Sequence, residues 1–535
     1  MILSSIVMPD HNGFPVRELC YRGDCPDVCA LKRGDVLCFD TYFGSFSCEK
    51  WRKYTDIENL RLRVKARGLF KISLLDQTGK LSESSLDFAD GLEHWIDIPG
   101  GARGILYFQA EALSDRAAFL GASYEGEPAA ARDVRIALNI CTYRREAYVS
   151  EIIRALNEGL KSCAGCVDAF VIDNGRTLDP GGFPRFVHLF PNENTGGSGG
   201  FARGMEEIIR AGLYTHMVMM DDDVRIHPES IERLYAFLQC LRPEYAENPV
   251  AGAMIRLDGT QTVQHEAGGV WREIRTDSIK ANLALRKFAN VVENEAEEPF
   301  DYAAWWFCCV PVAVAKRLGP PQPFFIRYDD VEYGLRIGLQ PLTLNGICVW
   351  HQPFESKCDP ALEYYSIRNG LAVNALHRTG FTAAKARRWV WRLYWGNIFR
   401  YRYMHFELIL RGVEDYLNGS FYHADQAALH RSLSDMARSL YTKEERPQAA
   451  DGTIAIKWDN ALTKIIGALT LNGMIFPFRG EAVVPAYRNS VRSHYRKRRV
   501  YNAVEGTDQG YWLYGSRKRA WKLLVRCAKL LSKMK

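Results

Sequence analysis

The hydrophobic and polar positions of the chain follow three successive patterns. In residues 1 to about 132, short alternating segments such as RLRVKARG, FKISLL and GILYFQAEAL are separated by Gly, Pro, Asp and Asn. Alternation with a period of two is typical of half-buried strands, and this part of the chain has no long helical period. We therefore predict a β-sandwich or jelly-roll domain over residues 1–132.

A different pattern begins near residue 133, where apolar runs end in polar or Gly-rich residues and helical stretches follow them. The expected strands are VRIALNICTYRRE, VDAFVIDNG, RFVHLFPNEN and YTHMVMMDDDV, with helices expected over 147–161 and in FARGMEEIIRAG. Strands that alternate with helices are typical of a mixed or parallel α/β sheet, which we predict over 133–375. The Trp-, Arg- and Leu-rich remainder has few helix breakers, so we expect a helical region over 376–535.

Composition agrees with a multidomain globular protein. The chain has 535 residues, of which 47% are hydrophobic and 25% charged, and these shares are average for globular proteins. The start of the sequence has no basic leader followed by an apolar run, and no later stretch supplies the roughly 18 uncharged apolar residues of a membrane helix. The 14 Cys lack the density of a disulfide scaffold. We expect a soluble, cytoplasmic protein.

Three consecutive carboxylates, Asp221, Asp222 and Asp223, follow the apolar run MVMM, where a buried strand is expected to leave the sheet. Ligands bind at this carboxyl edge in open α/β sheets, and oxygen ligands suit Mg²⁺ or Mn²⁺, which bridge substrate phosphates. In an extended backbone Asp221 and Asp223 point the same way. We predict that these two bind the metal of a nucleotide diphosphate, with Asp221 and Asp222 near the nucleotide. A solvated acidic turn is the competing interpretation.

A histidine is the candidate third protein ligand. His351 follows the strand-like LTLNGICVW and should also lie at the end of an element. A lone His is usually structural or solvated. A neutral imidazole can nevertheless complete a coordination sphere of carboxylates and diphosphate around Mn²⁺.

Polar residues at the other strand ends are candidates for the nucleotide-sugar pocket. Arg144 ends the first strand and Asp173 the second, although Asp173 is equally well explained as a turn cap. PNENTGGSGGFARGM is a Gly-rich loop that enters a helix, where backbone approaches anions closely. Asn194 and Arg203 could position the donor there. A plain flexible turn is the alternative, since no P-loop signature follows.

Aromatic and acidic residues downstream suggest an acceptor site. Trp305 and Trp306 precede PFFIRYDDVEYGLRI, in which Asp329 and Asp330 follow an apolar run. A carboxylate beside an incoming hydroxyl can act as a general base, and we choose Asp330 for this role. Buried Trp pairs more often belong to the core than to a sugar subsite.

Taken in order, these segments resemble bacterial galactofuranosyltransferases of glycosyltransferase family 2, which have the GT-A fold. The segments are TYFGSFSCEKWRKYT, TYRR, VIDNG, NTGGSGGFARG, MDDDV, WWFCC, FIRYDDVEYGLR, VWHQ and YYSIRNG. The resemblance implies inverting transfer of galactofuranose from UDP-galactofuranose to a lipid-linked glycan. It also implies roles for matched residues: metal and donor binding by Asp221, Asp223 and His351, catalysis by Asp330, acceptor binding by Asp329, Trp305 and Trp306, and donor binding by Arg144, Asp173, Asn194 and Arg203.

Basic charge is concentrated at the C-terminal end. Residues 490–535 hold 13 Lys+Arg and 2 Asp+Glu, a net charge of +11, so the rest of the chain has a net charge of −5. SRKRAWKLLVRCAKLLSKMK places apolar residues on one helical face, namely Ala520, Leu524, Cys527, Leu531 and Met534. Its basic face holds Lys518, Lys522, Arg526, Lys529 and Lys533. We predict peripheral contact with the anionic inner face of the bacterial cell membrane; nucleic-acid binding and a solvated helix face are the alternatives.

Two rival functions remain at this point. The same fold could use another nucleotide sugar, as a rhamnosyl- or glucosyltransferase does. The chain could also be a non-catalytic glycan-binding scaffold, although the full acidic set and His351 argue against that reading.

Overall fold

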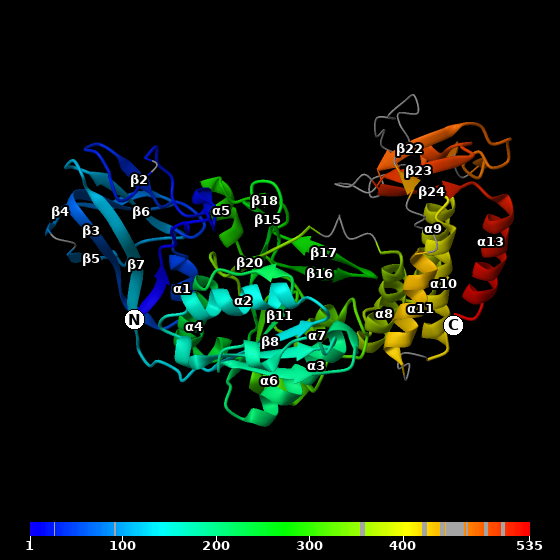
Figure 1. The fold of residues 1–535 in the computed structure, drawn as a ribbon, viewed down its shortest axis with the longest axis horizontal. Coiled ribbons are helices and arrows are strands. Elements are labelled where there is room, and N and C mark those ends of the chain that lie inside the picture. Colours follow the sequence, from blue (N-terminus) through cyan, green and yellow to red (C-terminus); the bar gives the residue numbers. More distant parts are fainter. Residues whose placement is uncertain are drawn as a thin grey trace. The chain divides into compact units, whose positions relative to one another are not determined.

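The protein is described from a computed structural model that covers residues 1–25, 27–89, 92–353, 359–419, 425–438, 444–445, 465–466, 469–485, 491–503 and 509–534. Figure 1 shows its mixed α/β elements. The chain divides into two compact units. The first comprises Met1–Val270, Thr276–Pro321 and Tyr333–Gln352, and the second Trp271–Arg275, Gln322–Glu332 and Pro353–Lys535. The expected boundary near residue 132 lies inside the first unit, and the three-domain division remains a prediction.

Antiparallel strands make up the N-terminal part of the first unit. They are β1 (Ile2–Ser5), β2 (Val36–Cys38), β3 (Ile57–Asp76), β4 (Gly79–Phe88), β5 (Glu93–Asp97), β6 (Leu106–Ala112) and β7 (Ala118–Pro128). The first half of β3 pairs with β5 and β7, and its second half with β4 and β6. RLRVKARG and FKISLL therefore belong to one strand. Gly68, at a φ of 93°, lies between them and lets the strand change partners without ending.

The central sheet has the strand order β10-β9-β8-β11-β19-β13. Its strands are β8 (Ile136–Thr142), β9 (Val167–Asp173), β10 (Val187–Pro191), β11 (His216–Asp221), β13 (Val250–Ala251) and β19 (Cys308–Pro311). The first four in this order are parallel, and β19 is antiparallel to β11. The chain runs outward from β8 to β10 and returns to β11 on the other side of β8. This reversal creates the topological switch point where ligands bind in open α/β sheets.

Helices α2 (Glu146–Gly159), α3 (Gly196–Ala211) and α4 (Glu229–Cys240) follow β8, β10 and β12 (Val224–Arg225). The Gly-rich segment, expected to be a loop that enters a helix, is itself the start of α3. A Cβ atom on Gly204 would come within 1.9 Å of Oδ1 of Asn139, and one on Gly200 within 2.1 Å of Sγ of Cys141. The glycines therefore allow α3 to pack closely against β8, which is a different role from an open loop.

A second sheet brings distant segments together in the order β12-β20-β14-β15-β18. Besides β12, it contains β14 (Ala253–Arg256), β15 (Val263–Glu266), β18 (Leu283–Ala284) and β20 (Cys348–His351). In the same part of the sequence, β16 (Gly268–Arg272) and β17 (Arg275–Ile279) form a separate two-stranded sheet. The helices of this part are α5 (Phe288–Glu295), α6 (Val312–Leu318) and α7 (Asp329–Ile337). Antiparallel pairing of β12 with β20 places Val224 opposite His351.

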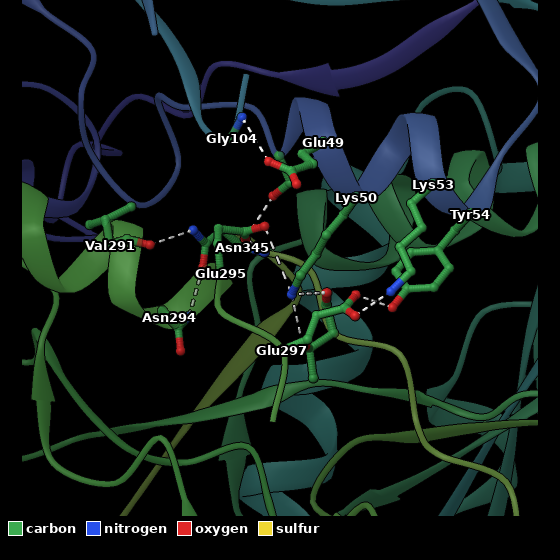
Figure 2. A network of polar contacts seen from close by, with 12 residues as sticks. Glu49, Lys50, Lys53, Tyr54, Gly104, Val291, Asn294, Glu295, Glu297 and Asn345 are labelled. Atoms are coloured by element: carbon green, nitrogen blue, oxygen red, sulfur yellow. Dashed lines mark hydrogen bonds and ion pairs between the residues drawn. The ribbon is translucent and has the colours of Figure 1, made fainter. Parts of the chain in front are cut away.

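A polar network joins helix α1 (Cys48–Tyr54) of the N-terminal part to α5 and the loop before β20 (Figure 2). Nζ of the buried Lys50 donates to the carbonyl oxygen of Thr343 at 2.8 Å and lies 3.8 Å from Oε2 of Glu295. Oε1 of Glu295 accepts from the backbone N–H of Asn345 at 3.1 Å. Nζ of Lys280, also buried, donates to the carbonyl of Asn294. These contacts fix the N-terminal strands to the α/β part.

The second unit contains α8 (Ala361–His377), α9 (Ala383–Ile398), α10 (Tyr403–Leu417), α11 (Gln426–Arg438) and α13 (Arg517–Leu531). It also contains a four-stranded sheet of β21 (Glu444–Glu445), β24 (Gln509–Tyr514), β23 (Arg499–Ala503) and β22 (Glu481–Pro485). The expectation of a mostly helical region therefore did not include this sheet. The sheet was missed because YRKRRVYNAV reads as a basic patch rather than as alternating apolar positions. Short 3-10 helices occur at Arg17–Leu19, Ala164–Cys166, Pro180–Gly182, Pro243–Tyr245 and Arg492–His494.

Helix α13 does not present its apolar face to solvent. Ala520, Cys527, Leu531 and Met534 are buried in the core of the second unit, and Leu524 packs against that core. Arg526, expected on the free basic face, pairs with Glu407 and Glu414 of α10. Across the described part of the chain, no helix combines the length and the apolar character needed to cross a membrane.

Candidate metal and donor site

Three side chains converge where β11, β12 and β20 meet. Asp221 is the last residue of β11, Asp223 immediately precedes β12, and His351 ends β20. One potential ligand atom from each lies within 4.8 Å of the others. Nε2 of His351 is 3.0 Å from Oδ1 of Asp223, and the His351 side chain is 1% exposed. Two carboxylates and an imidazole in this arrangement fit a divalent metal such as Mn²⁺ or Mg²⁺.

The strand register explains why these residues meet. Residues 217–220 of β11 are fully buried, so the following carboxylates are delivered to the edge of the sheet. Asp221 lies opposite Cys141 of β8, beside the switch point. The pairing of Val224 with His351 then brings Asp223 to the imidazole. The acidic turn therefore contacts a buried histidine of another strand. This contact is not expected for a turn that is exposed only to bulk solvent.

Arg145 compensates the negative charge of the cluster. Its guanidinium lies 2.9 Å from Oδ1 of Asp222 and 2.6 Å from Oδ2 of Asp223. Burial raises the pKa of Asp222, and the charge of Arg145 opposes that rise. We singled out Arg144 at this strand end and missed Arg145. The doubled arginine was the only signal, and it could not show which of the two faces the carboxylates.

The ends of β8 and β9 lie at the same edge, because Thr142 is opposite Asp173. The carboxylate of Asp173 is 1% exposed and accepts hydrogen bonds from the backbone N–H groups of Gly175, Thr177 and Leu178. It therefore organises the turn after β9, as expected for a turn cap. Arg144 is exposed, with a left-handed φ of 56°, and it lies against Gly175.

Asn194 and Arg203, the two donor-binding candidates near α3, contact residues that are close to them in sequence. Oδ1 of Asn194 accepts from the N–H of Gly196 at 3.1 Å, beside the start of the helix. Arg203 is one turn from Glu207 and pairs with it at 2.5 Å. Both lie on the segment between β10 and β11, and a role in donor binding remains a prediction for each.

Trp305 and Trp306 are each 5% exposed and make core contacts. Nε1 of Trp306 donates to the carbonyl of Gly252 at 3.0 Å. The ring of Trp305 packs edge-on against Phe201 and Tyr333. These contacts match the core interpretation of the Trp pair, and acceptor binding remains a prediction.

Asp329 and Asp330 belong to the second unit, at the start of α7. The residues before them adopt left-handed conformations that are unusual for large side chains: Phe325 at a φ of 72°, Arg327 at 72° and Tyr328 at 65°. Such strained backbone persists only when its surroundings hold it in place.

Two buried residues of α8 hold this strained segment. Nδ2 of Asn369 donates to the carbonyls of Ile326 and Arg327, both at 2.9 Å, and Nη2 of Arg368 donates to that of Phe324 at 2.8 Å. Asn369 and Arg368 are fully buried. The motif YYSIRNG, to which the sequence assigned no role, thus supports the backbone that leads to Asp330. The sequence signal for this role was Arg368, a charged residue in a helix that is largely buried.

Comparison with known proteins gives two curated relatives, and no family profile matches the chain. Galactofuranosyltransferase GlfT2 of Mycolicibacterium smegmatis is 28% identical over 405 residues, covering 67% of this chain and 61% of the relative. The protein of the same name from Mycobacterium tuberculosis is 28% identical over 442 residues, covering 71% and 66%. The chain therefore spans less than two thirds of the length of either relative.

Solved structures of glycosyltransferases also align with the chain, at low scores. Mannosyltransferase PcManGT from Pyrobaculum calidifontis, in complex with GDP-Man and Mn²⁺, aligns with a TM-score of 0.30 and 13% identity over 58% of this chain and 87% of that one. S. aureus TarS 1–349 in complex with UDP aligns with a TM-score of 0.30 and 11% identity over 61% and 98%. The strand order of the central sheet, and not these alignments, defines the fold. In sequence, the chain resembles the mycobacterial galactofuranosyltransferases, as its ordered motifs predicted.

Proposed function

We propose that the protein is an inverting, metal-dependent glycosyltransferase of the GT-A type that transfers galactofuranose from UDP-galactofuranose to a hydroxyl of a lipid-linked glycan. The observation that carries this proposal is the convergence of Asp221, Asp223 and His351 at the switch point of the sheet. The sequence similarity to galactofuranosyltransferases supports the choice of donor.

Each residue has a defined part in the proposed reaction. Asp221, Asp223 and His351 hold the divalent cation, which when bound neutralises charge on the diphosphate leaving group. Arg144, Asp173, Asn194, Arg203 and Asp222 line the donor pocket. Asp329, Trp305 and Trp306 position the acceptor. Asp330 accepts the proton of the acceptor hydroxyl. The anomeric carbon gains a bond to the acceptor oxygen as its bond to the diphosphate breaks, so its configuration inverts and UDP leaves.

Location at the inner face of the membrane is part of the proposal. A lipid-linked acceptor is held at a bilayer, and the net charge of +11 over residues 490–535 favours anionic headgroups. Because the apolar face of α13 is packed into the second unit, contact through this helix would be made by its basic side chains.

The test is the identity of the transferred sugar. Purified protein is incubated with UDP-galactofuranose, UDP-galactopyranose, UDP-glucose or dTDP-rhamnose and a galactofuranosyl-terminated lipid acceptor, and the product is analysed by mass spectrometry and NMR. The proposal predicts extension from the furanose donor only, with inverted anomeric configuration. Transfer from another donor would refute the sugar assignment and keep the enzyme class. Glycan binding without turnover of any donor would instead favour the scaffold alternative.

A further inference from the structure

The first unit contains a cleft of about 380 Å³ whose lining does not include Asp221, Asp223 or His351. Its walls are β1 and the loop after it, the second half of α2, and β12 with the start of α4. β1 packs against α4 and β12 packs against α2, so these elements form one compact part of the unit. The volume of the cleft is in the range of small-molecule sites, which measure about 300–1,000 Å³.

The loop after β1 is held in a fixed shape. Oδ1 of Asp10 accepts hydrogen bonds from the backbone N–H groups of Asn12 and Phe14, both at 2.8 Å. The Phe14 ring packs edge-on against Trp350 of β20, with the ring centres 4.7 Å apart. The guanidinium of Arg225 lies 3.6 Å from the centre of the Phe14 ring. These contacts preform one wall of the cleft, which reduces the conformational entropy that a ligand must remove on binding.

Two polar side chains that are close in sequence line the inner wall. Nδ1 of His227 accepts from the backbone N–H of Glu229 at 3.2 Å, and burial lowers the pKa of His227 to about 4. The imidazole is therefore neutral at pH 7 and carries its proton on Nε2, which has no partner among the described residues. Glu229 is 8% exposed, and its Oε1 atom accepts from the N–H of Ser5 at 2.6 Å. The inner wall thus provides a hydrogen-bond donor and a carboxyl acceptor.

The rest of the lining restricts the class of ligand. Five Asp or Glu side chains line the cleft against three Lys or Arg side chains, and this excess of negative charge disfavours phosphate or carboxylate ligands. An uncharged sugar ring fits, because its C–H faces pack on apolar side chains and its hydroxyl groups both donate and accept hydrogen bonds. The apolar side chains of the lining include Leu3, Phe14, Ile152, Ala155, Val224 and Ile226.

We propose that the cleft binds one uncharged sugar unit, with a hydroxyl group that accepts from Nε2 of His227 and donates to the carboxylate of Glu229. The inference rests on the proposed function, because we take the sugar to be a galactofuranosyl unit of the acceptor or product glycan. Val224 and Arg225 line the cleft and directly follow Asp223 in the chain. A glycan bound in the cleft is therefore held close to the proposed catalytic centre while its reactive end stays free.

The test is methyl NMR of the full chain during titration with methyl β-D-galactofuranoside. Ile152 and Ile226 line the cleft and report binding there, whereas the buried Ile72 of β3 does not line it and serves as the reference. We expect saturable shifts of the Ile152 and Ile226 methyl signals and none for Ile72.

Two variants and a control assign these shifts to the cleft. Ala155→Phe places a large side chain in the cleft and should raise the dissociation constant at least about tenfold. His227→Asn keeps an acceptor for the N–H of Glu229 but removes the Nε2 donor, and should raise the constant about threefold to tenfold. Ala211→Phe, at the exposed end of α3, is the matched control and should change it less than about twofold.

Three outcomes would overturn the inference. The Ile152 and Ile226 signals could stay unchanged at every galactofuranoside concentration. They could shift with the dication putrescine and not with the sugar, which would assign the cleft to a cationic ligand. Folded Ala155→Phe and His227→Asn could both bind the sugar like the wild type, which would place the sugar elsewhere.

Transfer from UDP-galactofuranose is measured in parallel, so that the two proposals can fail separately. Transfer without shifts at Ile152 and Ile226 would refute the sugar site in the cleft and keep the transferase. Shifts at both residues without transfer to any acceptor would refute the transferase and keep a sugar-binding cleft.

Discussion

Nε2 of His351 lies 3.0 Å from Oδ1 of Asp223, although 128 residues separate the two in sequence. The pairing of β12 with β20 creates this contact, and it brings the imidazole together with two carboxylates as a candidate set of three metal ligands. We predict that His351→Gln weakens Mn²⁺ binding at least about tenfold, measured by isothermal titration calorimetry. His188→Gln, at a half-exposed histidine of β10, should leave the affinity unchanged. Equal affinities in the wild type and His351→Gln would exclude the imidazole as a ligand.

The strained segment before Asp330 depends on Asn369. Asn369→Leu removes the donor to the carbonyls of Ile326 and Arg327, which are only partly buried, so the loss should cost about 1 kcal/mol for each hydrogen bond. We expect a lower thermal midpoint and a loss of transfer activity. Asn418→Leu changes an exposed asparagine of the same unit and should do neither. Full activity and stability in Asn369→Leu would show that the segment holds its shape unaided.

Asp330 is the proposed base, and its replacement gives a specific kinetic signature. Asp330→Asn should lower the turnover number about 10²- to 10⁴-fold, while UDP and Mn²⁺ affinities stay within about twofold. Asp435→Asn, at an exposed aspartate of α11, is the matched control. A loss of UDP affinity in step with turnover would point to a binding role instead.

Burial lowers the pKa of Lys280 from 10.5 to about 7, and nearby Lys50 adds to the shift. Between pH 7 and 10.5 the unfolded chain therefore keeps a proton that the folded chain has released. The contribution of this group to the free energy of unfolding rises with pH in that window, by at most about 1.4 kcal/mol per pH unit, and is flat below it.

Lys280→Met removes this dependence. Wild-type stability relative to the variant should increase from pH 7 to 10, as followed by urea unfolding midpoints, whereas exposed Lys287→Met should give a constant difference. A constant difference for Lys280→Met as well would mean that Lys280 stays protonated in the folded protein.

Sequence patterns predicted the strands whose residues follow one another along the chain. Apolar runs that end in Asp173 and Asp221 predicted strands with polar ends, and the structure places both at one edge of the sheet. The glycines of α3 were misread as a loop, because their role depends on the side chains of Asn139 and Cys141 on a neighbouring strand. The contacts of Arg145 and Asn369 were invisible for the same reason, since both partners come from distant segments. The amphipathic pattern located the apolar face of α13 correctly. It could not show that this face packs into the core of the second unit.

The most direct test of metal-dependent galactofuranosyl transfer is turnover of UDP-galactofuranose by EDTA-treated protein with and without added Mn²⁺ or Mg²⁺. We expect no transfer after EDTA, recovery on addition of the metal, and no recovery in Asp223→Asn. Asp258→Asn, at a half-exposed aspartate paired with Arg256, should recover like the wild type. Undiminished transfer in EDTA would exclude a metal-dependent reaction, and full recovery in Asp223→Asn would exclude Asp223 as a required metal ligand.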